Sequence, residues 1–323
     1  MKAKRLYAPE KGKIQLEEYE LPAVGRDQVL VKEYYTAISP GTEIAFLHGA
    51  PNTPNEFPFY PGYNACGVIE AVGEDVVGLK VGDMICQNGK HASYNVVDAN
   101  QFVLVPEGVS PREATVFRLA SIALQGLRKI QIQIGDRVAI LGLGPVGNLA
   151  VQTAKLAGAL EVDVFDISAE RRELALKCGA DHAYNNLADP AFAMKYDVVV
   201  EASGARGVVP STFEAAKKFG KVLLLGCTRN TEDGVNFYKD ILKNALTVVG
   251  AHEFCRPQVD NCGILKTTHY DDTTMLNFIG QGRINTDVLI SEVYSPENAQ
   301  EAYDRLYNRD PKLMLVSFDW SKV

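Results

Sequence analysis

The chain has 323 residues, of which 46% are hydrophobic and 23% are charged, and its formal net charge is −7 at pH 7. This length allows two domains, because single hydrophobic cores stop growing at roughly 250–300 residues. Acidic and basic residues are interspersed, without the basic stripe that is typical of a protein that binds nucleic acid. No run of about 18 apolar residues predicts a membrane helix, and residues 1–20 lack the apolar core of a signal peptide. We therefore expect a cytoplasmic protein with neither a nucleic-acid nor a membrane partner.

The six cysteines do not follow the spacing of a metal site or a disulfide framework. None makes a C-x-x-C pair, and both kinds of site need closer, patterned spacing. Most lie in apolar or strand-like stretches, so we expect reduced thiols. The residues are Cys66, Cys86, Cys178, Cys227, Cys255 and Cys262.

The first third of the chain has the pattern of β-strands separated by turns. We expect strands within 29–39 and 66–73, and two more within 91–106. Apolar residues then recur at three- and four-residue spacing over 113–130, which predicts one long helix.

From residue 137 onward, predicted strands alternate with helices. Apolar runs predict strands at 137–141, 161–166, 196–203, 221–227 and 246–251. Helices are expected between them at 146–158, 168–180 and 210–220. Ser168 is the expected N-cap of the second helix. Buried strands that alternate with helices are typical of a parallel sheet covered on both faces.

The last seventy residues return to a mixed pattern, with helical segments expected near 273–284 and 296–308. The simplest layout is a β-rich domain interrupted by the α/β domain. We expect the β-rich domain to comprise 1–117 and 253–323, and the α/β domain to comprise 118–252. Such boundaries are good to a few residues.

A glycine-rich turn joins the strand at 137–141 to the following helix. It reads Gly142-Leu143-Gly144-Pro145-Val146-Gly147, a G-x-G-x-x-G motif. In a dinucleotide site the first glycine allows the tight turn, the second lets the backbone approach the pyrophosphate, and the third lets the helix pack on the strand. The helix N-terminus then offers N–H groups to the phosphates. The cofactor-binding residues expected here are Gly142, Gly144, Pro145, Val146 and Gly147.

An acidic residue at the end of the second strand predicts the choice of cofactor. Asp166 lies 166 − 147 = 19 residues beyond the last glycine, where a carboxylate accepts from the ribose 2′-hydroxyl. The same carboxylate would repel a 2′-phosphate, so we expect NAD(H) rather than NADP(H). Arg171 and Arg172 follow on the helix and could reduce that preference. We expect Arg171 to lie near the adenine or on a solvated face.

At this point the whole chain resembles the medium-chain dehydrogenase/reductase superfamily. The resemblance rests on 57–85, on the strand at 91–98, and on 135–159 with 166–181 after it. The turn GLGPVG is similar to that of the alcohol and polyol branch. The resemblance implies a Rossmann doubly wound parallel sheet inserted in a β-rich, GroES-like catalytic domain. It also implies an oxidoreductase.

The zinc ligands of that superfamily are missing from the matching positions. The cysteine position of its C-G-T-D segment holds Pro40, and Tyr63 and Asn64 replace the His and Glu of G-H-E. The third position falls near Phe117–Arg118. A catalytic zinc needs three protein ligands among Cys, His and carboxylates, so we expect no metal, although Glu43 with His48 stays open as an unrelated metal pair.

The four closely spaced cysteines of the structural zinc are also missing after Gly82-Asp83. The variant segment 39–43, Ser-Pro-Gly-Thr-Glu, resembles a zinc-lacking branch that includes the bacteriochlorophyllide dehydrogenases. That similarity is short and does not fix the substrate.

Without zinc, another group must stabilise negative charge on the substrate oxygen. We expect Tyr63 to serve as general acid/base or oxyanion donor, or else to fill the volume left by the histidine. Thr42 matches the hydroxyl residue that starts a proton relay in zinc relatives, or it is a turn residue bonded to its own backbone. His91 is a third catalytic candidate, because a histidine can shuttle a proton near neutral pH.

Three further residues are expected to line the substrate. Asn64 could orient it, Glu43 follows the relay threonine, and His252 ends the last strand of the α/β domain. Either His91 or His252 could instead be a structural or exposed histidine.

Three functions remain open from the sequence. The leading one is NAD-dependent interconversion of a secondary alcohol (a polyol, sugar or cyclic alcohol) and its ketone. The alternatives are a zinc-free enone or quinone reductase and a non-catalytic NAD(H)-binding protein. The strand 246–251 is expected at a sheet edge, where pairing with a two-fold partner would cover it. We therefore expect a homodimer or homotetramer that acts on a small-molecule substrate.

Overall fold

The structure is a computed structural model that describes residues 2–100 and 102–323. It divides into two compact units, one formed by residues up to Arg118 with Asp272–Val323, the other by Leu119–Asp271. Gln101, inside the strand pair predicted over 91–106, lies outside the described residues. Among the described residues, no helix is both long and apolar enough to cross a bilayer.

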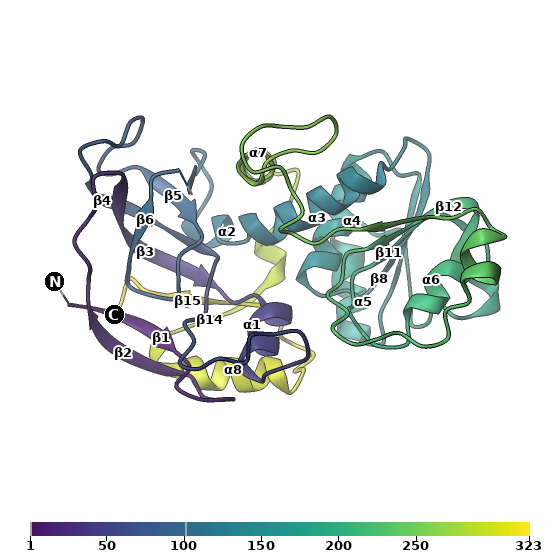
Figure 1. The fold of residues 1–323 in the computed structure, drawn as a ribbon, viewed down its shortest axis with the longest axis horizontal. Helices are drawn as coiled ribbons and strands as arrows, with labels where there is room; N and C mark the ends of the chain where they lie inside the picture. The colour runs from purple at the N-terminus through teal and green to yellow at the C-terminus, as the bar shows by residue number, and fades with distance from the viewer. Residues whose placement is uncertain (1, 101) are drawn as a thin grey trace. The chain divides into compact units, whose positions relative to one another are not determined.

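The first unit is built mainly of β-strands (Figure 1). One sheet has the order β14-β15-β3-β4-β5-β7, with β6 also paired to β3, and a separate pair joins β1 to β2. Neighbouring strands of the larger sheet are antiparallel, except that β14 and β15 are parallel to each other. The strands are β1 (Lys2–Tyr7), β2 (Gln15–Glu20), β3 (Gln28–Ala37), β4 (Ala65–Val72), β5 (Met84–Gln87), β6 (Tyr94–Asp98), β7 (Phe102–Leu104), β14 (Ile290–Tyr294) and β15 (Leu315–Asp319).

Strand β3 illustrates why these residues form a sheet. Val29, Val31 and Glu33 alternate inward along it, as the period of two in a strand requires. Two helices pack together beside the sheets, α1 (Pro40–Leu47) and α8 (Ala299–Tyr307). Leu47 of α1 and Tyr303 of α8 enter one core cluster, which Trp320 also joins.

The second unit is a six-stranded, fully parallel sheet with the order β10-β9-β8-β11-β12-β13. This confirms the predicted parallel sheet. The strands are β8 (Arg137–Leu141), β9 (Glu161–Phe165), β10 (His182–Tyr184), β11 (Tyr196–Glu201), β12 (Ala216–Leu224) and β13 (Thr247–Gly250). The helices that this unit places around the sheet include α4 (Pro145–Leu156), α5 (Ala169–Lys177) and α6 (Val209–Ala215) (Figure 1).

Helices cover both faces of this sheet. Leu223 of β12 faces Gly126 of the helix α3 (Phe117–Ile130), where an added Cβ would meet the Leu223 side chain at 3.3 Å. The preceding residue Val222 packs in a cluster with Phe213 of α6. Successive strand residues point to opposite faces, so α3 and α6 lie on opposite sides. The strand order reverses between β8 and β11, which is where doubly wound sheets bind ligands.

Two helices predicted from the sequence are shorter than expected. The helix at 113–130 is split into α2 (Pro111–Ala114) and α3, because the chain tightens at Thr115, whose hydroxyl donates to the Arg112 carbonyl at 2.6 Å. The helix at 210–220 ends at Ala215, because Ala216 already pairs with Tyr196 of β11. The first correction reflects a local hydrogen bond, and the second reflects a tertiary contact that overrides local periodicity.

The return boundary of the inserted unit lies at Asp272 rather than at 253. The segment 253–271 joins the second unit because Arg256 is buried against it. Its guanidinium lies 3.5 Å from the Ser121 hydroxyl and 3.8 Å from the Asp271 carboxylate. The α7 helix (Thr268–Gly280) therefore begins in one unit and continues into the other.

Candidate functional site

The glycine-rich turn follows β8 and is constrained differently at each glycine. Gly142 has φ +93°, and an added Cβ would lie 2.4 Å from Cα of Ser203. At Gly147 a Cβ would lie 1.9 Å from the Gly142 oxygen. At Gly144 a Cβ would meet nothing within 4 Å. The protein itself therefore requires the first and third glycines, whereas the second leaves open space of the kind that a closely approaching ligand would use.

Helix α4 starts directly at this turn. Gly144 is its N-cap, and Pro145 occupies the first helical turn, where a missing N–H costs nothing. The buried Asn148 amide donates to the Leu143 carbonyl at 2.8 Å and to the Gly144 carbonyl at 3.2 Å. These bonds hold the turn, so the backbone N–H groups at the start of α4 keep the orientation that suits an anion.

Asp166 lies just beyond β9 and is bonded to the same turn. One carboxylate oxygen accepts the Leu143 N–H at 2.8 Å, and the other accepts the Ser168 N–H at 2.9 Å. Each carboxylate oxygen can accept a second hydrogen bond. Asp166 is only partly buried. The acid is thus positioned by the turn and can still accept from a ribose hydroxyl.

The two arginines after Asp166 take different positions. Arg172 donates to the Asp166 backbone carbonyl at 2.7 Å, so its charge is not paired with the Asp166 carboxylate in that bond. Arg171 lies in the first turn of α5, and its N–H is capped by Ser168, the predicted N-cap. The turn, the N-terminus of α4 and Asp166 together fit the pyrophosphate and ribose of a dinucleotide.

In the other unit, Tyr63 precedes β4 and its hydroxyl donates to the Ser39 Oγ. Ser39 is the N-cap of α1, yet its side chain makes no capping bond to the helix. The Glu43 carboxylate instead accepts the Ser39 N–H at 2.7 Å. The chain reaches Tyr63 through Gly62, whose φ of +103° brings its backbone against that of His91. Tyr63 is partly exposed, so its ring borders open space.

Glu43 and His91 lie in a buried network instead of on a surface. His91 is 0% exposed and Glu43 is 2% exposed. The Glu43 carboxylate contacts His91 Nε2 at 3.0 Å and accepts from the Tyr303 hydroxyl at 2.6 Å. Burial, followed by the Glu43 charge, raises the pKa of the Tyr303 hydroxyl. Direct contact of Glu43 or His91 with a substrate therefore has no support in this structure.

The second ring nitrogen of His91 also has a hydrogen-bond partner inside the protein. Its Nδ1 lies 2.7 Å from the Thr36 hydroxyl, which also accepts from Trp320 Nε1 at 2.9 Å. Because Glu43 supplies an acceptor at Nε2, the network places a proton on Nε2. A histidine held at both nitrogens serves to position its neighbours, and here it anchors the helix that carries Ser39.

The other predicted substrate residues are scattered. Asn64 is fully buried; its amide nitrogen lies 3.4 Å from the Ala37 carbonyl, and its Oδ1 has no hydrogen-bond partner among the described residues. Thr42 lies in the first turn of α1 and is partly exposed. His252, just beyond β13, is exposed and accepts the Phe254 N–H at 3.3 Å.

A buried carboxyl that sequence reasoning missed lies in the same unit. Glu33 is 1% exposed, and burial raises its pKa to about 8 although Asn95 and Gln87 donate to it. The sequence did offer a signal for its burial: Glu33 is two residues beyond Val31 and four beyond Val29, so the strand period turns all three side chains inward. Ser39 was also missed, because its bond to Tyr63 belongs to no motif of known spacing, unlike the bond between the glycine-rich turn and Asp166.

The positions expected for zinc ligands hold chemistry that does not suit zinc. Tyr63 is bonded to Ser39, and Arg118 forms a buried ion pair with Asp272 at 3.1 Å. In the described part of the chain, one trio of side chains could converge on a cation: Glu161, Asp163 and His182. Lys195 already contacts both carboxylates of that trio, at 3.3 and 2.7 Å. The ammonium therefore already supplies a positive charge to both carboxylates.

Comparison with known proteins agrees with this geometry. The family model described as "Alcohol dehydrogenase GroES-like domain" matches residues 25–107, and the one described as "Zinc-binding dehydrogenase" matches 145–261. The chain belongs to the medium-chain dehydrogenase/reductase superfamily. It is accordingly an oxidoreductase of the alcohol dehydrogenase type.

Three proteins similar to this chain illustrate the range of its relatives. A sorbitol dehydrogenase from Bacillus subtilis is 26% identical, with 90% of each chain covered. A putative zinc-binding dehydrogenase from Sinorhizobium meliloti, bound to NADP, is 25% identical with a TM-score of 0.84 and 99% of each chain covered. An Escherichia coli alcohol dehydrogenase complexed with NADH is 20% identical with a TM-score of 0.85; 98% of this chain and 99% of that chain are covered. The last likeness shows the fold alone.

Proposed function

We propose that this superfamily member interconverts a secondary alcohol and its ketone with NAD(H), and that it does so without zinc. The observation that carries the proposal is the Tyr63 hydroxyl bonded to Ser39 at the position where the resemblance implies a zinc-binding histidine. A hydroxyl can donate to a developing alkoxide, which is the task that zinc performs in relatives.

The preference for NAD(H) rests on Asp166. Its carboxylate is held by two backbone N–H groups, so it cannot move away from a 2′-phosphate without breaking them. Like charges at hydrogen-bond distance repel, which disfavours NADP(H). Arg172, the nearest candidate to offset that repulsion, is bonded to the Asp166 carbonyl.

The nicotinamide supplies or accepts the hydride when the cofactor is bound. During ketone reduction, Tyr63 donates its proton to the carbonyl oxygen as that oxygen becomes negative. The Ser39 hydroxyl then turns to donate a hydrogen bond to the tyrosinate oxygen, and the partly exposed Tyr63 recovers its proton from water. Alcohol oxidation runs these proton movements in reverse. Thr42, one helical turn from Ser39, is the alternative donor.

The remaining groups are assigned to positioning. Asn64 is buried, as Glu43 and His91 are, so it too is assigned to positioning; its amide nitrogen lies 3.4 Å from the Ala37 carbonyl. Glu43 and His91 hold α1, and with it Ser39, in place. His252 is exposed beyond β13 and keeps a role in substrate contact only as a proposal. The substrate class proposed is a polyol, sugar or cyclic alcohol, in keeping with the sorbitol dehydrogenase relative.

An activity screen tests this function directly. Purified protein is assayed with NAD and NADP against a panel of polyols, sugars and cyclic alcohols, and with NADH against quinones and enones. The zinc content of the same sample is measured by elemental analysis. We expect alcohol-dependent NADH formation that persists in strong chelator, with well under one zinc per chain. Turnover of quinones alone, bound cofactor without any turnover, or stoichiometric zinc would each contradict the proposal.

We further propose that the protein forms dimers through β13. This strand ends the parallel sheet, and its exposed residue Val248 lies on an edge that another strand could extend. Pairing with the same strand of a two-fold partner closes the edge. Light scattering at micromolar concentration should give twice or four times the mass of one chain, and a monomer would contradict the proposal.

A further inference from the structure

Glu201 is a buried carboxyl at the end of β11, at the point where the strand order of the second unit reverses. It pairs with Leu141 at the end of β8 on one side and with Leu224 at the end of β12 on the other. The three residues before it in β11 are valines, and a fourth apolar residue would be cheaper to bury than a carboxyl. A carboxyl at this place indicates a role beyond packing.

The Glu201 carboxylate closes the turn that follows β11. Its Oε1 accepts the Ser203 N–H at 2.7 Å and the Gly204 N–H at 2.9 Å, and it also accepts from the Ser203 hydroxyl. These bonds fix the direction of the chain as it leaves the strand. Gly204 has φ +61°, in the left-handed region that favours glycine. The shape of this turn therefore depends on the side chain of Glu201.

The loops that follow the two neighbouring strands are packed directly against this turn. An added Cβ at Gly142, in the glycine-rich turn after β8, would lie 2.4 Å from Cα of Ser203. At Gly226, just beyond β12, a Cβ would lie 2.5 Å from Glu201 Oε2 and 2.5 Å from the Gly204 nitrogen. The loops after β8, β11 and β12 thus meet around the Glu201 carboxylate, with no room for a side chain at either glycine.

This arrangement costs stability. Glu201 is 0% exposed, and its Oε2 has no hydrogen-bond partner among the described residues. Burial raises the pKa of Glu201, although the bonds from Ser203 and Gly204 act in the opposite direction. Burial of a carboxyl with one unpaired oxygen is unfavourable. Proteins keep such departures mainly where function requires them.

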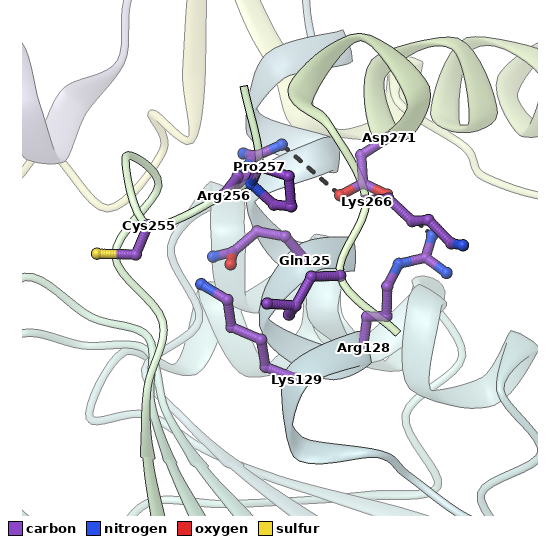
Figure 2. A pocket seen from close by; sticks show the side chains of 9 residues that line it. Gln125, Arg128, Lys129, Cys255, Arg256, Pro257, Lys266 and Asp271 are labelled. Atoms are coloured by element: carbon purple, nitrogen blue, oxygen red, sulfur yellow. Dashed lines mark hydrogen bonds and ion pairs between the residues drawn. The ribbon is translucent and has the colours of Figure 1, made fainter. Parts of the chain in front are cut away.

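The loop after β13 is held in a different way. The Gln125 amide of α3 donates to the Ala251 carbonyl at 2.6 Å. Farther along, the Arg256 guanidinium lies 3.8 Å from the Asp271 carboxylate, as the dashed line in Figure 2 marks. A change at Glu201 should therefore act on the loops after β11 and β12 and leave the loop after β13 in place.

The loops after β11 and β12 lie in the other half of the sheet from Asp166. A doubly wound sheet binds a dinucleotide across the reversal of strand order, with one nucleotide over each half. Asp166 follows β9, so the half β8-β9-β10 takes the adenosine. The half β11-β12-β13 is left for the nicotinamide nucleotide.

We propose that Glu201 is a positioning residue for the nicotinamide nucleotide: it holds the loops after β11 and β12 in the shape that this half of the cofactor requires. The glycine-rich turn has its own bonds to Asn148 and Asp166, so the adenosine half should keep its site when Glu201 is changed. The inference rests on the proposed use of NAD(H) but not on the zinc-free chemistry at Tyr63.

Calorimetric titration with NADH and with ADP tests the proposal, because ADP carries the adenosine and both phosphates but no nicotinamide nucleotide. In Glu201→Gln the neutral amide accepts less strongly from the turn, and its NH₂ group is buried in the place of the unpaired Oε2. We expect NADH to bind about tenfold more weakly than to the wild type, and ADP to stay within about twofold. Glu214→Gln, the same change at an exposed acid of α6, is the matched control and should bind both ligands as the wild type does.

Thermal unfolding of the same samples separates positioning from a merely structural role. A structural role would weaken NADH and ADP binding together, or would lower the melting temperature with both affinities unchanged, and either result overturns the proposal. If Glu201→Gln fails to fold, Glu201→Asp, whose carboxylate is one methylene short of the turn, is titrated with the same expected result. A wild type that binds neither ligand overturns both this proposal and the proposed use of NAD(H). Normal wild-type binding of both ligands with an unchanged NADH affinity in the variant overturns this proposal alone.

Discussion

The glycine-rich turn of the second unit and the Tyr63 region of the first unit differ in how their parts are joined. In the turn, the side-chain hydrogen bonds span at most 23 residues, the distance along the chain from Leu143 to Asp166. Around Tyr63, the bonds join Ser39 to Tyr63, Glu43 to His91, and Glu43 to Tyr303, which is 260 residues away. The first region is specified locally, whereas the second exists only after the whole unit has folded.

The largest expected effect is a loss of stability, and it should differ between two glycines of the turn. Gly147→Ala would force a Cβ to 1.9 Å from the Gly142 oxygen, so it should lower the free energy of unfolding by more than about 3 kcal/mol. Gly144→Ala meets no atom within 4 Å and should cost about 1 kcal/mol or less as a poorer N-cap. It should nevertheless weaken NAD(H) binding at least tenfold. Chemical denaturation and cofactor titration of both variants measure this, and equal losses of stability would contradict it.

The second largest expected effect is a loss of stability on changing Glu43, the centre of the buried network. Glu43→Gln places an amide NH₂ among three donors (the Ser39 N–H, His91 and the Tyr303 hydroxyl), so at least one of them loses its acceptor. We expect a loss of about 3 kcal/mol, at the upper end for a hydrogen bond to a charged group. Glu107→Gln, at an exposed acid of the same unit, is the control and should be neutral. Denaturant midpoints that match for the two variants would mean that the network does not hold the unit.

The buried carboxyl of Glu33 should appear in the pH dependence of stability. Its pKa in the folded chain is about 8, above the ordinary value of 4.5, so the folded state holds the proton more tightly. Stability from this group is therefore complete below about pH 4.5 and is lost as the pH rises towards 8, by on the order of a few kcal/mol. Glu33→Gln should lack this loss and become the more stable protein near pH 8. Parallel pH profiles for wild type and variant would contradict the assignment.

The smallest expected effect concerns cofactor choice. Asp166→Asn removes the charge that repels a 2′-phosphate, so the ratio of NADP(H) to NAD(H) affinity should rise about tenfold, or about 1.4 kcal/mol. Glu173→Gln, at an exposed position of α5, should leave the ratio unchanged. Fluorescence titration of NADH and NADPH gives both constants. A wild type that already binds NADPH more tightly than NADH would contradict the role given to the Asp166 charge.

The contrast between the two regions also explains what the sequence could predict. The parallel sheet, the turn and the Ser168 N-cap follow from patterns a few residues long, and the structure contains all three. The early end of α6 at Ala215 depends on the pairing of Ala216 with Tyr196, which no short window of sequence contains, and the break at Thr115 depends on a local hydrogen bond that apolar periodicity does not report. Local periodicity therefore predicted which helices and strands are present better than it predicted where they end.

The first unit was harder to predict for the same reason. His91 was expected as a proton shuttle, yet both of its nitrogens are bonded inside the protein. A sequence shows that a histidine is present but does not show its two partners, Thr36 and Glu43, which come from distant segments. Ser39 was overlooked because only the fold brings it to Tyr63. Residues that act through non-local contacts need the structure before a role can be assigned to them.

The turnover of Tyr63→Phe tests the central claim most directly, because it deletes the hydroxyl and keeps the ring. Tyr307→Phe, at a half-exposed tyrosine of the same unit, is the matched control. With zinc-free protein, we expect kcat of Tyr63→Phe to fall by about 10²–10⁴-fold, the range for a general acid–base group. NAD affinity should stay unchanged, and the control should turn over normally. Turnover of Tyr63→Phe within about threefold of wild type, far below that range, would make Tyr63 a space-filling residue and contradict the account.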